Sequence, residues 1–302
     1  MSMESPLNAL ENADIKLPPL QGTLVRAIEI MQQPGSAPFE DVVGLVEHDP
    51  GVASRLLRMA NSPYFGLRHP ITSIHRMVTI LGAGPVLGIV MNLSLRQAQL
   101  TGRAHTASKQ LISHSVATAF LARHLLAHDP ASNTVEDHRG RDVFTASLLH
   151  DIGKLVLLYN KPAVAVPFYQ ASALTVHSDA EVLEQERTLF GYDHVEAGVY
   201  LAKELQFPEL LTAAIARHHS YDRLSTEDAA IKGVVFLVAA ASKAANMLGY
   251  TLNRADTSET SHADPWGLLL KEQVLTYPSV EALLAKVVAA EDELAAYIQA
   301  VS

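Results

Sequence analysis

The 302-residue chain contains no cysteine, and this absence removes several classes of site. Disulfides, thiolate nucleophiles and cysteine-ligated zinc or iron–sulfur sites are all excluded. Positive charge is also scarce, because 23 Lys and Arg stand against 32 Asp and Glu, giving a net charge of −9. This balance argues against a protein that coats nucleic acid or an anionic membrane. If a metal binds, imidazole and carboxylate groups must hold it, and the chain has 14 histidines.

Long uninterrupted apolar runs are lacking too. The longest stretch without a charged side chain covers residues 77–95, nearly the length of a membrane span. Gly82, Gly84, Pro85 and Gly88 interrupt it, so we predict a buried turn between two core helices. The first twelve residues contain no basic region followed by an apolar run, so no secretory signal is expected. We therefore expect a soluble protein of the bacterial cytoplasm.

Helical periodicity dominates the apolar pattern, and no segment shows the sustained alternation of a strand. The composition, 48% hydrophobic and 18% charged, is sufficient for a sizeable core. Helix N-caps are predicted at Asp49, Ser73, Asp142, Ser178, Asp193 and Thr226. Two closing helices are predicted over residues 266–301. The sequence therefore predicts an all-α protein.

Two pairs of ionisable residues fall where an apolar pattern makes charge costly. His150 and Asp151 stand side by side in the segment SLLHDIGKLVLL, which we predict to be one apolar helix. His218 and His219 repeat the anomaly at a predicted helix end. Groups of this kind are usually paired, hydrogen-bonded or bound to a metal, and ligands from several helices can converge in a bundle core.

Lys154 and the isolated residues His114 and His194 complete the candidate set. Lys154 lies one turn beyond His150 and can place an ammonium against a phosphate, although a lysine on the helix surface fits the pattern equally well. Taken singly, each histidine is more simply a core or surface residue. Taken together, they fit a site for Fe, Mn, Zn or Ni that activates water for attack on phosphorus.

Three segments carry a resemblance to known families. HDIGK, preceded by LISHSVATAF, resembles the HD superfamily of metal-dependent phosphohydrolases. The stretch FGYDHVEAGVYLAKELQFPELLTAAIARHH resembles the second-metal half of that superfamily. The upstream segment VVGLVEHDPGVASRLLRMANSPYFGLRHPITSIHRMVTILG is similar to the HDOD (HD-related output domain) family.

The resemblance implies a domain organisation. We expect an HDOD domain over residues 17–250, followed by C-terminal helices over 264–302. Within the domain, an N-terminal helical half (17–100) is expected to pack on an HD-domain-like helical bundle (108–250). We also expect the N-terminal half to shape access to the histidine cluster.

The resemblance also implies ligand sets. His114, His150 and Asp151 match the superfamily's first ion site, and Asp151, His194, His218 and His219 match the second site of HD-GYP-type phosphodiesterases. The distal Asp of the first site is replaced by Ser242. The GYP element expected after the histidine pair is absent from the sequence.

The charge of such a site limits the number of ions. With Asp151 as the only assigned anionic ligand, two divalent ions would leave the site near +3, which a buried cavity tolerates poorly. Asp179, Asp193, Asp222 or Asp228 can supply negative charge, but the sequence places none of them there. One ion, or none, is easier to accommodate.

The resemblance implies a signal-transduction output module that binds a protein partner and has weak or no hydrolase activity. The alternative is an active metal-dependent phosphohydrolase or (cyclic di)nucleotide phosphodiesterase, and a weaker third reading is iron-dependent oxygen chemistry. A nucleotide or phosphate ligand fits this family context. No sensor or receiver domain is visible, so we expect the input to come from another protein. The basic residues between Arg55 and Arg76, near Tyr64 and Phe65, fit a solvated face better than a partner or nucleic-acid surface.

Overall fold

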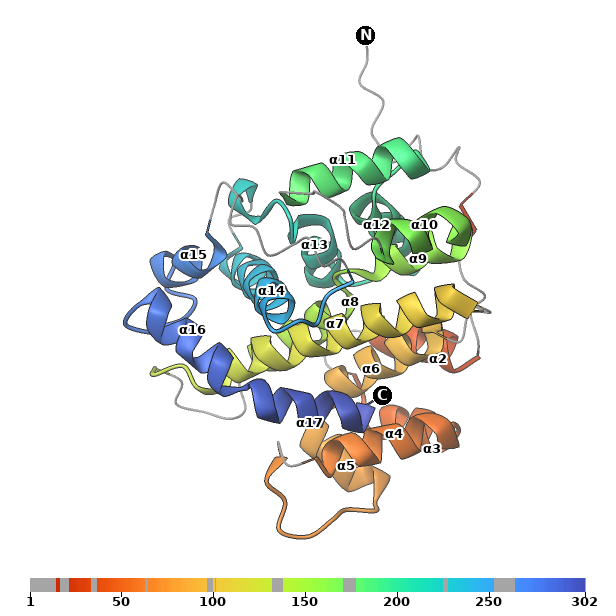
Figure 1. Cartoon of the computed structure of the whole chain (residues 1–302). Helices are drawn as coiled ribbons and strands as arrows, with labels where there is room; N and C mark the ends of the chain where they lie inside the picture. The colour runs from red at the N-terminus through yellow and green to blue at the C-terminus, as the bar shows by residue number, and fades with distance from the viewer. Residues whose placement is uncertain are drawn as a thin grey trace.

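Helices joined by turns make up the part of the chain that the computed structural model describes (Figure 1). The described residues are 15–16, 22–33, 37–62, 65–96, 100, 102–131, 138–170, 178–224, 228–252 and 264–301. No strand occurs among them, so the all-α prediction is confirmed. The predicted cap at Thr226 and the aromatic residue Tyr64 lie outside the described residues.

The N-terminal half contains α2 (Gly22–Met31), α3 (Phe39–Glu47), α4 (Pro50–Ala60), α5 (Ile74–Leu81) and α6 (Ala83–Arg96). The predicted caps at Asp49 and Ser73 are confirmed, since each side chain accepts backbone N–H bonds from the first turn of its helix. The predicted buried turn is confirmed as well. Gly82 takes a φ of +91° there, a conformation that favours glycine, and α5 and α6 meet at 103°.

The half of the chain expected to be HD-like is built around the long helix α7 (Gly102–Ala127), which packs against α8 (His138–Leu149) and α14 (Ala229–Met247). The remaining elements of this half are α9 (Ile152–Asn160), α10 (Pro162–Gln170), α11 (Asp179–Phe190), α12 (His194–Glu204), α13 (Glu209–Arg217) and the 3₁₀ turn η2 (Tyr221–Arg223). In Figure 1, α7 runs across the molecule, with the N-terminal helices on one side and α9 to α14 on the other.

One prediction about this half is wrong in a way that matters for the site. The segment SLLHDIGKLVLL is not a single helix, because α8 ends at Leu149 and α9 begins at Ile152. His150 and Asp151 form the turn between the two helices. Asp151 makes no capping bond to α9, so its carboxylate is free to face the core of the bundle. The cap predicted at Asp142 is also wrong, since α8 begins earlier, at His138.

The C-terminal region forms three helices rather than the predicted two: α15 (Pro265–Lys271), α16 (Val280–Ala289) and α17 (Glu291–Val301). Asp264 caps α15 ahead of Pro265, and Ser279 caps α16. Each of these polar N-caps starts a helix of its own, so the region forms more helices than its apolar pattern predicts. The last helix, α17, returns to pack on α4 and α7, and buries Leu294 and Tyr297.

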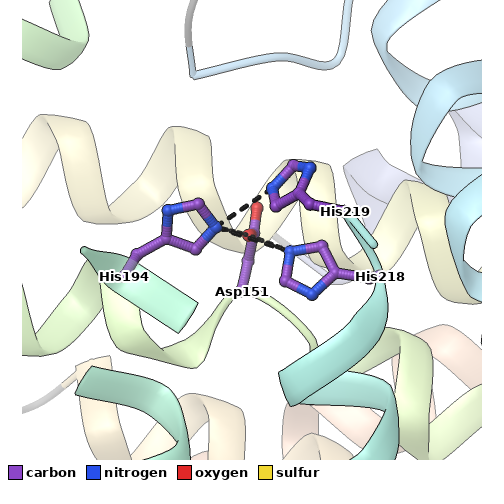
Figure 2. Close-up of side chains that lie close together, drawn as sticks. All are labelled: Asp151, His194, His218 and His219. Carbon is purple, nitrogen blue, oxygen red and sulfur yellow. Dashed lines mark hydrogen bonds and ion pairs between the residues drawn. The ribbon is translucent and has the colours of Figure 1, made fainter. Parts of the chain in front are cut away.

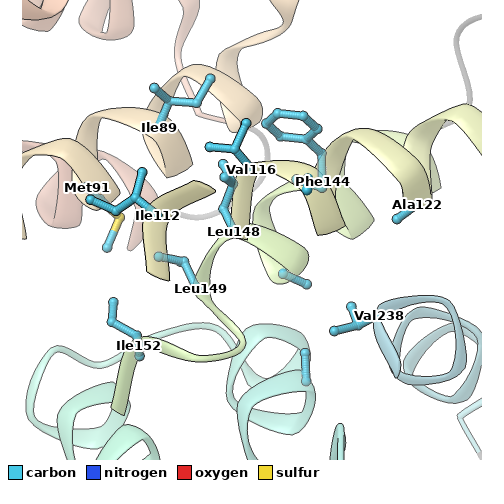
Figure 3. Close-up of a cluster of buried hydrophobic side chains, with 14 of the residues drawn as sticks. Ile89, Met91, Ile112, Val116, Ala122, Phe144, Leu148, Leu149, Ile152 and Val238 are labelled. Carbon is cyan, nitrogen blue, oxygen red and sulfur yellow. The ribbon is translucent and has the colours of Figure 1, made fainter. Parts of the chain in front are cut away.

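Close packing of α6 on α8 joins the two halves of the domain (Figure 3). A Cβ at Gly88 would lie only 3.2 Å from Leu148 Cδ1, so glycine lets the two helices approach. Asn92 donates a hydrogen bond of 3.0 Å to the Leu148 carbonyl. The N-terminal half therefore supports the end of α8, directly before the turn that carries His150 and Asp151.

The apolar helices lie within the protein core. By length and composition α14 could cross a membrane, yet 61% of its apolar window is buried inside the protein. The bent pair of α5 and α6 passes the same test only if the two helices are counted as one span. Helix α14 and the α5–α6 pair are therefore described as helices of the protein core.

Candidate metal centre

Five imidazole rings from separate parts of the fold surround the carboxylate of Asp151, and Figure 2 shows three of them, those of His194, His218 and His219. The six residues occupy the middle of α7, the α8–α9 turn, the first position of α12 and the two positions after α13; they are His114, His150, Asp151, His194, His218 and His219. All are buried except His219, which is half-buried. The structure thus brings together every residue that the sequence predicts as a ligand.

A close contact between α9 and α12 makes this convergence possible. A Cβ at Gly153 would overlap the carbonyl of His194 and lie 2.6 Å from the backbone nitrogen of Gly198. Only glycine fits at position 153, and its absence of a side chain brings Asp151 against His194. Asp193 fixes the start of α12 through a capping box with Glu196, as its predicted capping role requires.

The first group of ligand atoms, which we call the Oδ1 half, contains Asp151 Oδ1 and the Nε2 atoms of His194, His218 and His219. Asp151 Oδ1 lies 3.4 Å from Nε2 of His194 and 3.4 Å from Nε2 of His218. The Nε2 atoms of His194 and His218 are 3.4 Å apart, and those of His194 and His219 are 3.1 Å apart. The four atoms therefore face a common point.

The second group, the Oδ2 half, contains Asp151 Oδ2 and the Nε2 atoms of His114 and His150. Asp151 Oδ2 lies 3.6 Å from His114 Nε2 and 3.5 Å from His150 Nε2. Ser242, which the resemblance aligns with the distal Asp, places its Oγ 3.2 Å from His114 Nε2. The Lys154 ammonium lies 2.8 Å from Asp151 Oδ2 and makes an ion pair with it. The lysine therefore faces the site and is not a helix-surface residue.

Hydrogen bonds behind each ring determine which nitrogen faces inward. The Nδ1 atoms of His114, His150 and His218 lie 2.7, 2.7 and 2.9 Å from the backbone carbonyls of residues 250, 147 and 215. The Nδ1 atoms of His194 and His219 face carboxylates. Since a carbonyl or carboxylate only accepts, each Nδ1 donates, and each neutral ring presents a lone pair on Nε2 to the centre.

Of these two carboxylates, Asp179 was among the acidic residues that the sequence offered to supply negative charge, whereas Glu186 was not identified from the sequence. Glu186 Oε2 lies 2.6 Å from His194 Nδ1, and Asp179 Oδ2 lies 3.0 Å from His219 Nδ1. Tyr169 donates a 2.7 Å hydrogen bond to the other oxygen of Glu186. The capping motif at Ser178 places Asp179 at the start of α11, but nothing in the polar pattern of α11 distinguishes the buried Glu186.

The other acidic residues considered as extra ligands lie elsewhere. Asp193 is buried, but it caps α12 and pairs with Arg187. Asp222 and Asp228 are exposed, and Asp228 caps α14 in the place predicted for Thr226.

Burial sets the charge of most groups in the cluster. Burial lowers the pKa of His114, lowers that of His150 well below its usual value, and lowers the pKa of His218 to about 4. Burial alone would raise the pKa of Asp151, but Lys154 and His150 outweigh it, and the pKa falls well below the usual value. At neutral pH, Asp151 is therefore an anion, and the rings of His114, His150 and His218 are neutral.

His219 shows the opposite shift. Burial acts to lower the pKa of His219, but the neighbouring Asp179 carboxylate outweighs it and raises the pKa above the usual value. The same contact holds the pKa of Asp179 below its usual range despite burial. The pKa of Glu186 is likewise lowered, because His194 outweighs the effect of burial.

The cavity beside the cluster is small. Its volume is about 30 Å³, room for one or two water molecules. The described residues that line it belong to the later part of the chain, among them Ser178, His219, Ser242, Lys243 and Pro265. Among the described residues, the N-terminal half does not line this opening, but Asn92 of that half lines a second small cavity, of about 20 Å³, that reaches Asp151. That the N-terminal half shapes access to the cluster stays a prediction.

The donor set fits a divalent transition metal. Asp151 Oδ1 is buried and has no hydrogen-bond partner, although three Nε2 atoms surround it. When His219 is neutral, four lone pairs point at one place and repel each other unless a cation lies between them. Imidazole and carboxylate are the ligands that Fe, Mn, Zn and Ni accept, and Nδ1 bonds of the kind seen here orient metal-binding histidines.

Comparisons with known proteins concern the family and the fold. The family model of the HDOD domain matches residues 17–221. An HDOD domain protein of unknown function from Geobacter sulfurreducens has a TM-score of 0.68 at 19% identity, covering 98% of this chain and 97% of its own. A candidate signal transduction protein from Marinobacter aquaeolei VT8 has a TM-score of 0.66 at 21% identity, covering 100% of this chain and 62% of its own.

A candidate phosphohydrolase from Shewanella amazonensis SB2B has a TM-score of 0.62 at 20% identity, with 99% of both chains covered. These likenesses show a shared fold. An uncharacterized protein of Treponema pallidum (strain Nichols) is 23% identical over 204 residues, and the chain spans only 38% of its length.

Proposed function

The chain belongs to the HDOD domain family, and we propose that it is a metal-binding signal-transduction output module whose HD-type centre has weak or no hydrolase activity. The observation that carries the metal-binding part is the unpartnered Asp151 Oδ1 among three inward-facing imidazoles. The residues that would hold the ion are Asp151, His194, His218 and His219. When bound, the metal supplies a Lewis acid that lowers the pKa of a coordinated water.

Two features of the site argue against efficient hydrolysis. Ser242 supplies a neutral hydroxyl where the superfamily pattern has a carboxylate, so the Oδ2 half has lost an anionic ligand. The opening of about 30 Å³ leaves no room for a phosphodiester beside the cluster in this conformation. Both features favour an output module over an enzyme.

The second candidate is a metal-dependent phosphohydrolase or (cyclic di)nucleotide phosphodiesterase. The inward-facing ammonium of Lys154 favours it, because such a group can neutralise a phosphate oxygen. In this reading Lys243, which lines the opening, would receive the outer part of the substrate. The opening would have to widen before any nucleotide could enter.

Metal analysis and a substrate panel separate these candidates. Full-length protein purified without an affinity tag is analysed for metal, next to Asp151→Ala and the control Asp222→Ala, which changes an exposed aspartate. We expect bound metal in the wild type and in the control, and none in Asp151→Ala. A wild type that takes up no Mn, Fe, Zn or Ni would remove the metal-binding function. Rapid phosphodiester turnover, lost in Asp151→Ala, would instead establish the enzyme.

We also propose where the protein partner binds. A groove of about 880 Å³ lies between α4, α5 and Ala296 of α17, with Ala53, Leu57, Ile71 and Ile74 among its apolar lining residues. Leu57 and Ile74 are half-buried, so apolar surface is accessible there. A groove of this shape suits the apolar face of a helix.

Charge complementarity defines that helix further. Residues 50–95 contain four arginines and no acidic residue, although the whole chain carries −9. Arg58 lines the groove, and Arg68 and Arg76 are exposed nearby; Glu47 is the one acidic residue among the lining residues described. The proposed occupant is therefore an acidic amphipathic helix of a partner protein.

Site-specific photo-crosslinking tests this surface. A crosslinker replaces Ser54 in the groove or, as a control, Val288, which is 58% exposed on α16. We expect Ser54 alone to capture a segment that mass spectrometry identifies as an acidic amphipathic helix, and Leu57→Glu to abolish the capture. Capture that survives Leu57→Glu, or that involves a basic segment, would exclude the proposed occupant.

A further inference from the structure

We propose that the two halves of the cluster hold different cations: one divalent ion in the Oδ1 half, and the Lys154 ammonium in the Oδ2 half in place of a second ion. The proposal rests on the metal-binding function above and specifies its stoichiometry. In this proposal the Lys154 ammonium takes the place of the second ion, and Ser242 offers no charged ligand to such an ion. The centre therefore binds a single metal ion.

The position of Lys154 is built into the fold. Its Nζ lies 2.8 Å from Asp151 Oδ2, and its side chain is only 14% exposed. The lysine lies three residues after Asp151, in the first turn of α9, and its backbone N–H donates to the Asp151 carbonyl at 2.9 Å. The ammonium is thus held against the carboxylate by the helix itself.

Protein donors reach two of the three ligand atoms of the Oδ2 half. Ser242 Oγ can donate to His114 Nε2 at 3.2 Å, and Lys154 donates to Asp151 Oδ2. The third atom, His150 Nε2, faces His114 Nε2 at 3.3 Å. By contrast, Asp151 Oδ1 has no hydrogen-bond partner. The need for a cation from outside the protein is therefore greater in the Oδ1 half.

Charge neutrality favours the same stoichiometry. One divalent ion and the Lys154 ammonium carry three positive charges, and the carboxylates in contact with the cluster, Asp151, Asp179 and Glu186, carry three negative charges. A second divalent ion would leave two positive charges uncompensated in a buried site. Replacing the superfamily's Asp by Ser242 removes the anion that would have helped to hold that ion.

Replacing Lys154 and Ser242 together should create a second metal site in the Oδ2 half. Lys154→Met removes the ammonium with little change in length, and Ser242→Asp returns a carboxylate beside His114. The cavity that Ser242 lines gives the longer side chain space to enter. The double variant would then offer His114, His150, Asp151 and position 242 to a second ion.

Manganese loading of the full chain tests the proposal. Apo protein is saturated with Mn²⁺ and desalted, and the Mn content per chain and the electron paramagnetic resonance spectrum are measured. We expect one Mn with an isolated six-line spectrum in the wild type, and two Mn with an exchange-coupled spectrum in Lys154→Met/Ser242→Asp. Lys203→Met, which changes an exposed lysine on α12, is the control and should keep one Mn.

The outcomes distinguish this inference from the function on which it rests. Two Mn per wild-type chain would overturn the inference and leave the metal-binding function intact. A folded double variant that still binds one Mn would overturn it too. A wild type without Mn at saturation would remove the metal-binding function and the inference together. The wild-type count decides the question even if the double variant does not fold.

Discussion

The two halves of the cluster share Asp151 and differ in what stands behind their rings. In the Oδ2 half, His114 and His150 donate to backbone carbonyls. In the Oδ1 half, His218 also donates to a backbone carbonyl, but His194 and His219 donate to carboxylates, which make an imidazole a stronger metal ligand. The comparison teaches that two groups of ligands can match one metal-binding pattern and still differ: carboxylates stand behind two rings of the Oδ1 half, whereas in the Oδ2 half Lys154 already pairs with the shared carboxylate.

The largest expected effect comes from separating the two halves. Gly153→Ala would force a Cβ into the His194 carbonyl and move α9 away from α12, and with it Asp151 from the Oδ1 half. Because backbone blocks the new methyl group, we expect a loss of about 3 kcal/mol or more in the free energy of unfolding. Urea denaturation of the metal-free protein measures it.

Gly44→Ala is the matched control for that substitution. Gly44 lies inside α3 with nothing within 4 Å of a Cβ, so alanine should stabilise the protein by about 0.5–1 kcal/mol. If Gly153→Ala stays within about 1 kcal/mol of the wild type, the close approach of α9 and α12 does not hold the halves together.

The next prediction compares one ring from each half. His194→Gln removes a ligand of the Oδ1 half and should weaken Mn²⁺ binding by about 100-fold or more, equivalent to about 2.8 kcal/mol. His114→Gln changes a ring in the Oδ2 half and should alter the affinity by less than about threefold, about 0.7 kcal/mol. Calorimetric titration with Mn²⁺ gives both values. Equal losses in the two variants would mean that the halves act as one binuclear site.

A smaller effect is expected from the carboxylate behind His194. Glu186→Gln keeps the shape of the side chain but removes its charge, so Mn²⁺ affinity should fall by about 10- to 100-fold. Tyr169→Phe, which removes only the hydroxyl that donates to Glu186, should cost less than tenfold. An affinity unchanged by Glu186→Gln would show that the carboxylate serves the packing of α11 and not the ligand.

Glu186 also shows which parts of the structure could be predicted from the sequence and which could not. Periodicity and caps such as Asp49, Ser73 and Asp193 predicted the helical class and many boundaries, because those signals are local. The ligand rings were predicted from their motifs. Glu186 could not be, because its burial depends on how α11 packs over α12, a contact between helices that no local pattern records.

The same limit explains the error at the α8–α9 turn. The segment around His150 and Asp151 is apolar enough for one continuous helix, and no proline marks the break. The contact of Gly153 with α12 is long-range, and it requires α9 to start in a new direction. The sequence thus predicted which residues act but not how the chain turns to bring them together.

The last prediction concerns protons. Below the raised pKa of His219 its ring is protonated, with Nδ1 donating to Asp179 and Nε2 facing His194 Nε2 at 3.1 Å. A bound ion needs the Nε2 lone pair, so binding must release that proton.

Mn²⁺ affinity should therefore rise with pH, by up to about tenfold per pH unit, until the pH passes the pKa of His219. The rings of His150 and His218, whose pKa values lie well below the usual value and at about 4, are neutral at pH 6 and release none. Calorimetry in buffers of different ionisation enthalpy should count more protons released per ion at pH 6 in the wild type than in Asp179→Asn, where the pKa of His219 is no longer raised. If both proteins release the same number of protons, Asp179 does not hold a proton in the Oδ1 half, and the contrast between carboxylate-backed and carbonyl-backed rings loses its electrostatic basis.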